Sequence, residues 1–154
     1  MKVLFSAFLV GIALLLGPDG TAVAGSAATE PLTIKTATAS HAFDVELAVT
    51  PEQHGKGLMY RRTMPANAGM LFLYGNGSKV TMWMANTYIP LDMLFIGPTG
   101  RITHIAERTV PHSTELIGSN GPVRAVLELN GGTASRLGIK VGDLVQHPAF
   151  QLEP

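Results

Sequence analysis

Residues 88–107, YIPLDMLFIGPTGRITHIAE, are the part of the sequence that most clearly predicts the fold. A strand is expected over residues 88–96, and its residues 91–96 are apolar on both faces apart from Asp92, a pattern typical of a central strand. Residues 97–100 (GPTG) form a strong turn signal, and residues 101–107 supply the expected partner strand. A strand, a tight turn and a returning strand indicate a β-rich domain.

Short strands divided by turn signals continue in both directions from this unit. We expect residues 75–77 (GNG) to turn a hairpin between the third and fourth strands of the chain. About eight short strands at this spacing predict a mainly β fold, a compact barrel or sandwich with one or two small helices. The further expected strands are residues 32–35, 43–49, 70–74, 79–84, 123–129 and 144–147.

Two short helices are expected. Thr50 can cap the first helix, Pro51 suits its first position, and Gln53 can complete a capping box, so the helix is predicted to run to about Tyr60. The second helix, residues 133–137, follows the strand expected at residues 123–129 and is closed by Gly138, which favours a C-cap.

The N-terminus has the layout of a secretory signal peptide. Lys2 precedes an apolar run over residues 3–16, and Ala22 and Ala24 occupy the small-residue positions before a cleavage site. We therefore expect residues 1–24 to be removed after Ala24 and the protein to be periplasmic or secreted. An uncleaved anchor helix is the alternative. Residues 25–31 are expected to form a flexible leader, 32–148 a single domain and 149–154 a C-terminal tail.

The composition excludes several classes of protein. The chain of 154 residues contains no cysteine, so it has no disulfide, no thiolate metal site and no lipidation site of the lipoprotein kind. Its 11 basic residues balance 11 acidic ones without a block of like charge, which argues against a nucleic-acid footprint or a polybasic membrane patch. We expect a monomer with no cofactor, no nucleic-acid partner and no stable membrane span after cleavage.

Methionines gather in the middle of the sequence. Met82 and Met84 lie two residues apart, so on a strand they share one face while Trp83 points the other way. Thioethers suit Cu(I), but methionine more often fills gaps in a core, and no histidine lies close in sequence. Core packing is the favoured interpretation, and a Cu(I) site at these two methionines is the alternative.

Asp92 is the least expected residue of the central strand, because a buried carboxylate needs a partner. Arg61, or failing that Arg62, could hold it with two bonds. The pair could fix how the first helix docks on the sheet. It could equally form the polar part of an apolar pocket with Trp83 and Asn86, and the sequence leaves both interpretations open.

Six short blocks of the sequence together form a recognisable pattern: GLMYR (57–61), GMLF (69–72), WMANT (83–87), IPLD (89–92), LEL (127–129) and LGI with GD (137–143). In these blocks the sequence resembles the family known as domain of unknown function 192, and the resemblance covers almost all of the expected mature chain. Two departures from the usual pattern of the family are Ala85, where lysine is common, and Gly131, where alanine is common. The resemblance implies a compact β-rich barrel or sandwich in a mostly exported family, and it implies no activity, cofactor or substrate.

The function expected from these observations is a non-enzymatic, exported binding or accessory module. Its ligand-binding residues would be Arg61, Trp83, Asn86 and Asp92, which suit a small glycan or peptide fragment. A periplasmic Cu(I) site at the two methionines is the second hypothesis. The third is a hydrolase with Asp92 or Glu128 as general base, and it lacks an accompanying nucleophile or metal set.

Overall fold

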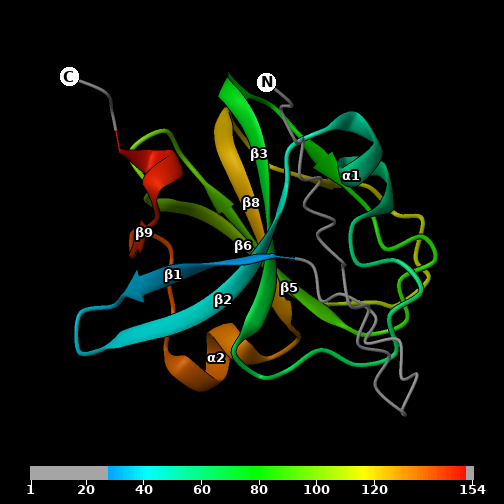
Figure 1. The fold of residues 1–154 in the computed structure, drawn as a ribbon, viewed down its shortest axis with the longest axis horizontal. Helices are drawn as coiled ribbons and strands as arrows, with labels where there is room; N and C mark the ends of the chain where they lie inside the picture. The colour runs from blue at the N-terminus through cyan, green and yellow to red at the C-terminus, as the bar shows by residue number, and fades with distance from the viewer. Residues whose placement is uncertain (1–27, 152–154) are drawn as a thin grey trace, which may run out of the picture.

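A computed structural model describes residues 28–151, which fold around one curled seven-stranded sheet (Figure 1). The strand order is β6-β5-β8-β3-β2-β1-β9, and β4 and β7 form a separate two-stranded sheet. The strands are β1 (Thr29–Lys35), β2 (Ser40–Ala48), β3 (Ala68–Ser78), β4 (Thr81–Met82), β5 (Leu91–Ile96), β6 (Ile102–Thr109), β7 (Ile117–Gly118), β8 (Val123–Asn130) and β9 (Leu144–Gln146).

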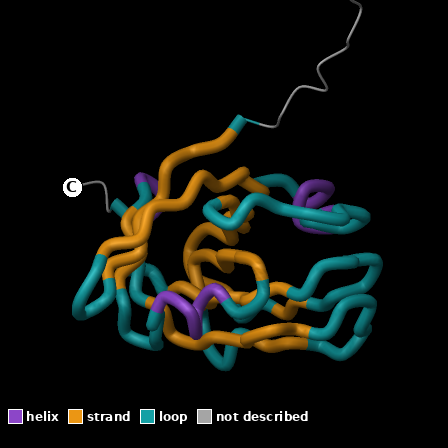
Figure 2. Tube along the Cα trace, turned by 90° about the horizontal axis from the view of Figure 1, so that it is seen from below, coloured by secondary structure: helices purple, strands orange, loops and turns teal. Residues whose placement is uncertain are grey.

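The two edges of the large sheet meet at one end. Arg101, just before β6, forms an isolated bridge to Leu144 of β9, and Val145 N donates to the Gly100 carbonyl at 2.8 Å. Figure 2 shows the strands curving around a shared interior, with loops on both sides of them. The predicted mainly β fold is confirmed, and its form is a curled half-barrel rather than two stacked sheets.

The central strands are buried on both faces. On β5, β8 and β3, alternate residues enter two different cores, so that Leu94 and Leu127 lie in one while Phe95 and Val126 lie in the other. The second core contains most of the methionines and is bounded by Leu58 and by the short β4 strand. All six residues of β5 are buried, as the apolar run predicted, but the strand begins at Leu91 rather than at Tyr88.

Three helices complete the fold. They are α1 (Pro51–Lys56), α2 (Thr133–Leu137) and a 3-10 turn at Pro148–Phe150. The predicted capping box of α1 is present, with Gln53 N donating to Thr50 Oγ1 at 3.2 Å. Both ends of α2 are as predicted, and Gly138 closes it in the left-handed conformation. Helix α1 connects the parallel pair β2 and β3, because parallel neighbours need a crossover.

Two expected elements differ in the structure. The predicted hairpin at residues 75–77 is wrong: β3 continues to Ser78 along β8, and Gly75 and Gly77, with φ of +72° and +82°, lie in an irregular stretch of that pairing. Helix α1 ends at Lys56 rather than near Tyr60, because Gly57 turns the chain at φ +45°. A side chain there would also begin 3.1 Å from the Phe72 ring.

The N-terminal prediction is tested only at its edge. Residues 29–31, expected in the leader, belong to β1 and pair with β2. The proposed signal peptide and the rest of the leader lie outside the described residues. Among residues 28–151, no helix combines the length and apolar character that crossing a membrane requires.

Candidate functional site

Asp92 is fully buried and binds backbone groups rather than an arginine. Its Oδ1 accepts from the N–H groups of Arg108 and Gly132, and its Oδ2 accepts from Ala134 N, each at 2.8 Å. The predicted pairing of Asp92 with Arg61 is therefore wrong, and Arg62 does not replace it. A buried carboxylate that accepts from three N–H groups already has the polar partners that burial demands.

Arg61 pairs instead with Glu46 of β2. The guanidinium donates two hydrogen bonds, of 2.5 and 2.8 Å, one to each carboxylate oxygen. This bidentate hydrogen bonding is the main reason that the pKa of Glu46 lies below its ordinary value and the pKa of Arg61 above its own. The pair ties the segment after α1 to the sheet, as predicted for Arg61, but through a different carboxylate.

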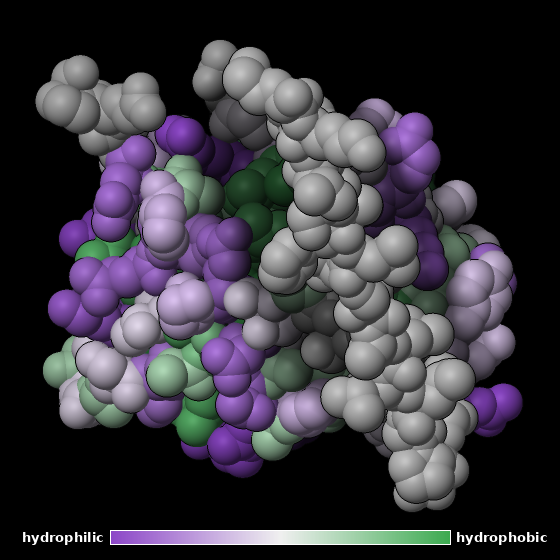
Figure 3. Space-filling model, viewed as in Figure 1, coloured by the Kyte–Doolittle hydropathy of each residue, from purple (hydrophilic) through white to green (hydrophobic). Residues whose placement is uncertain are grey.

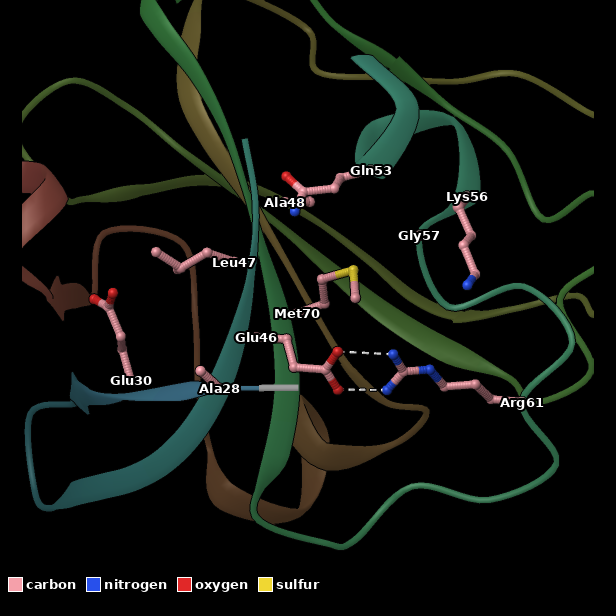
Figure 4. Close-up of a pocket in the computed structure, with 10 residues that line it drawn as sticks. All are labelled: Ala28, Glu30, Glu46, Leu47, Ala48, Gln53, Lys56, Gly57, Arg61 and Met70. Atoms are coloured by element: carbon pink, nitrogen blue, oxygen red, sulfur yellow. Dashed lines mark hydrogen bonds and ion pairs between the residues drawn. The ribbon is translucent and has the colours of Figure 1, made fainter. Parts of the chain in front are cut away.

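A cleft of about 480 Å³ lies beside this pair, within the size range of small-ligand sites (Figure 4). Gln53 and Lys56 reach it from α1, and Arg61 spans it toward Glu46. Its apolar lining comes from Leu47, Ala48 and Met70 of the sheet. Asp92 is absent from this cleft, and so are Trp83 and Asn86, so the structure does not gather the four predicted ligand-binding residues in it.

Asn86 lies in a turn that holds two loops together. It adopts φ +56°, Thr87 N donates to the Met84 carbonyl across the turn, and Tyr60 N donates to the Asn86 carbonyl at 2.9 Å. Asparagine tolerates this left-handed position better than most residues, which explains its place in the turn. Trp83, three residues before Asn86, is 50% exposed, whereas its neighbours Met82 and Met84 are buried, so its side chain points outward.

The contacts of Asn86 lead to a surface that the sequence did not single out. Tyr60 and Tyr88 lie edge to face with ring centroids 6.1 Å apart, and the His112 ring lies 5.1 Å from Tyr88. The Arg62 guanidinium lies 5.7 Å from the centre of the Tyr88 ring. Arg62, Tyr88 and His112 line an open hollow of about 430 Å³. We call Tyr60, Arg62, Tyr88 and His112 the aromatic surface.

Two members of the aromatic surface have strained backbones. Tyr60 has φ +66° and His112 has φ +62°, and the neighbouring Asn86 is left-handed as well. Such conformations cost about 1–3 kcal/mol each and persist only where the surroundings enforce them. Two backbone hydrogen bonds enforce them here: Tyr60 N donates to the Asn86 carbonyl, and His112 N donates to the Thr87 carbonyl. Three loops thus hold exposed rings in a fixed arrangement.

The methionines lie in the core, which supports the favoured interpretation. Met82 Sδ accepts from the Tyr74 hydroxyl at 3.2 Å, and Met84 Sδ accepts from the Thr109 hydroxyl at 3.1 Å. Their sulfurs therefore have different partners on different strands. No group of three or more His, Cys, Asp or Glu side chains suited to a metal occurs among residues 28–151. A Cu(I) site built on thioethers stays a prediction.

Glu128, the other candidate base, points into the methionine-rich core. Its cross-strand neighbours are Met70 and Met93, and it is 4% exposed. Burial raises the pKa of Glu128 to about 8, so the carboxyl group holds its proton at neutral pH. A protonated Glu128 and a fully hydrogen-bonded Asp92 are both poorly placed to act as a general base.

The sequence contained one signal for the aromatic surface. Tyr60 stands in the GLMYR block and Tyr88 follows WMANT, but nothing in the sequence spacing shows that His112 joins them. Figure 3 shows one face of the molecule, on which hydrophilic residues surround small, separate apolar patches.

Residues 32–147 match the model of the DUF192 family, described as "Uncharacterized ACR". A crystal structure described as "a putative transcription regulator" from Sinorhizobium meliloti 1021 is 50% identical, with a TM-score of 0.78, covering 81% of this chain and 98% of that one. A second, of a protein of unknown function from Novosphingobium aromaticivorans DSM 12444, is 43% identical, with a TM-score of 0.76, covering 77% of this chain and 85% of that one. No curated protein matches the chain.

Proposed function

The chain belongs to DUF192, a family of uncharacterised proteins, and from that premise we propose that it is a binding module whose ligand site is the aromatic surface. The observation that carries the proposal is the strained, fixed presentation of exposed rings. Tyr60 is 58% exposed and Tyr88 38% exposed, although both rings belong to loops pinned by backbone hydrogen bonds.

The strain has no evident benefit for stability. A glycine at position 60 would remove the left-handed penalty, and an exposed ring contributes little to the core. Strained conformations cluster at binding and catalytic sites because rigid presentation lowers the entropy lost on binding. A role in recognition accounts for a tyrosine where glycine would be the less strained choice.

The chemistry of the surface favours a short glycan. Flat rings stack on the apolar faces of sugars, while the Arg62 guanidinium and the His112 imidazole offer oriented hydrogen bonds to hydroxyl groups. The hollow is open, which suits one or two units of a longer chain. A peptide fragment is the other ligand class that this set of groups could take, and the test below separates the two.

Titration of the protein with soluble glycan fragments and with short peptides, followed by NMR amide shifts, tests the proposal. Glycan binding should move the signals of residues 60–62, 86–88 and 110–113 together. Tyr60→Gly should weaken binding about tenfold or more while leaving the melting temperature within a few degrees, because relief of strain offsets the lost ring contact.

Val110→Gly is the matched control, because Val110 is 68% exposed, lies in the same region and is not left-handed. It should lose stability slightly and keep its affinity. Saturable binding of a peptide at the same residues, without binding of a glycan, would identify the ligand as a peptide. No saturable shift with either class, or equal affinity in Tyr60→Gly, would refute the aromatic surface as the site.

Two further points support a small-ligand module in the cell envelope over a regulator of transcription. The 11 acidic and 11 basic residues balance, whereas DNA binding calls for a basic stripe. Residues 1–24 have the features of a signal peptide, and export with cleavage after Ala24 is part of this proposal.

A further inference from the structure

A second hollow, distinct from the aromatic surface, lies where β6 ends and α2 begins. It has a volume of about 450 Å³. Its lining consists of Met64, Ala66, Arg108, Asn130, Gly131, Gly132, Thr133 and Arg136. The Asn130 side chain donates to the carbonyls of Met64 and Pro65, at 3.1 and 3.0 Å, and so fixes the loop that forms one wall.

The two arginines that line this hollow, Arg108 and Arg136, have no carboxylate among the described residues to neutralise them at its surface. The salt bridges among residues 28–151 are Arg61 with Glu46 and His147 with Glu30, so neither Arg108 nor Arg136 has a carboxylate partner in the described part of the chain. Both side chains are exposed. Two arginines on one concavity repel each other, which costs free energy unless an anion lies between them.

The Asp92 carboxylate positions the first of these arginines. By accepting from the N–H groups of Arg108, Gly132 and Ala134, it joins the end of β6 to the start of α2. Arg108 is held at φ +49°, a conformation that a non-glycine residue adopts only under constraint. The constraint is the hydrogen bond from its own N–H to Asp92.

Gly132 leaves the space that the guanidinium needs. A Cβ on Gly132 would lie 3.0 Å from both Nε and Nη2 of Arg108, and Gly132 itself has φ +88°. The Arg108 guanidinium therefore lies directly against the backbone of the loop before α2. A buried carboxylate, a strained arginine and a left-handed glycine together aim one side chain at the hollow.

Stabilisation of α2 does not account for this arrangement. Arg136 is in the last turn of α2, where a cation is favourable, but Arg108 lies beside the first turn, where a cation is unfavourable. No carboxylate of residues 28–151 lines the hollow, and Asp92, which holds the Arg108 N–H, is buried and already hydrogen-bonded to three N–H groups. The charges of the two arginines are therefore not neutralised within the lining.

We propose that this hollow binds the phosphate or sulfate group of a small molecule, held by Arg108 and Arg136 with the Thr133 hydroxyl as a further donor. Planar guanidinium groups match oxyanions of this kind with paired hydrogen bonds. An adjoining hollow of about 330 Å³ shares Ala66 and Arg136 with the first and is also lined by Ser40, His41 and Asn67. It offers polar contacts to the uncharged remainder of the ligand.

The test is an NMR titration of the whole protein, at low salt and constant ionic strength set with chloride. The probes are inorganic phosphate, inorganic sulfate and glycerol 3-phosphate. We expect saturable shifts at residues 108 and 131–136, with glycerol 3-phosphate binding more tightly than inorganic phosphate if the adjoining hollow takes part. Sulfate equal to or tighter than phosphate would assign the site to sulfate groups.

Arg108→Gln and Arg136→Gln should each weaken binding about tenfold or more, with melting temperatures near that of the wild type. Lys79→Gln, which removes an exposed cation elsewhere, should bind as the wild type does. Tyr60→Gly should also bind these anions normally, so failure here and failure of the glycan proposal are separate results. Shifts that do not saturate in the millimolar range, or equal affinity in all variants, would overturn the anion site.

Discussion

Removal of the Asp92 carboxylate should destabilise the protein more than any change at its surface. Three N–H groups lose their acceptor in Asp92→Ala: those of Gly132 and Ala134 are buried, and that of Arg108 is partly buried. Each stranded buried donor costs about 1–3 kcal/mol, so the two buried donors alone cost about 2–6 kcal/mol, a large share of the stability of a small domain, about 5–15 kcal/mol. We expect Asp92→Ala to be largely unfolded at 37 °C or to fail to fold.

Asp92→Asn gives the more informative measurement, because the amide keeps the shape of the side chain. Its oxygen can replace Oδ1, which accepts from Arg108 and Gly132, while its NH₂ group would then face the N–H of Ala134. The hydrogen bond from Ala134 N is lost and two donors face each other there, while the bonds from Arg108 N and Gly132 N no longer have a charged acceptor. A loss of about 2–4 kcal/mol follows, measured by urea unfolding at pH 7 followed by circular dichroism.

Arg61→Ala tests whether Arg61 is a partner of Asp92. Asp92 and Arg61 share no hydrogen-bond partner, so the losses in Asp92→Asn and Arg61→Ala should add to within about 0.5 kcal/mol in the double variant. A coupling above about 1 kcal/mol would show that the two residues interact after all. A stability of Asp92→Asn equal to that of the wild type would refute the role of the carboxylate as a clamp.

Three further predictions concern other parts of the chain. Burial raises the pKa of Glu128 from 4.5 to about 8, so the contribution of Glu128 to stability is full below pH 4.5 and is lost as the pH rises through 8. Urea unfolding between pH 4.5 and 8 should show the wild type losing about 5 kcal/mol of stability relative to Glu128→Gln. If the methionines are core residues, Met82→Leu/Met84→Leu should bind Cu(I) no differently from the wild type and lose less than about 1.5 kcal/mol, whereas sub-micromolar binding that disappears in the variant would support the metal site. N-terminal sequencing of the exported protein should begin at Gly25, and a start at Met1 would contradict cleavage.

The elements with strong local signals were predicted correctly from the sequence. The turn at residues 97–100 and the glycine after α2 each fix the backbone within a few residues, so the end of β5, the start of β6 and the whole of α2 lie within one residue of their expected positions. Glycines 75 and 77 misled the prediction because left-handed residues serve bulges as well as hairpin turns. Only the pairing of β3 with β8, a contact between distant residues, decides between the two.

The candidate site shows a different limit of sequence reasoning. The burial of Asp92 and its need for a partner could be predicted, because a carboxylate in an apolar strand must be satisfied. Its partners could not, since backbone N–H groups belong to every residue and two of them, at Gly132 and Ala134, lie 40 and 42 residues away. The aromatic surface escaped prediction for the same reason, because His112 reaches Tyr88 only through the fold.

The sequence left two roles open for Asp92, a structural pair or a part of a binding pocket, and its geometry makes the two compatible. The carboxylate touches no solvent and can touch no ligand, yet it holds Arg108 in a left-handed conformation and the start of α2 in place beside it. A substitution at Asp92 should therefore weaken anion binding even where the protein still folds. In Asp92→Asn, measured below its melting temperature, the affinity for glycerol 3-phosphate should fall although both arginines remain, because the group that positions one of them has changed. An unchanged affinity would mean that Arg108 needs no such support, and that the buried carboxylate serves the fold alone.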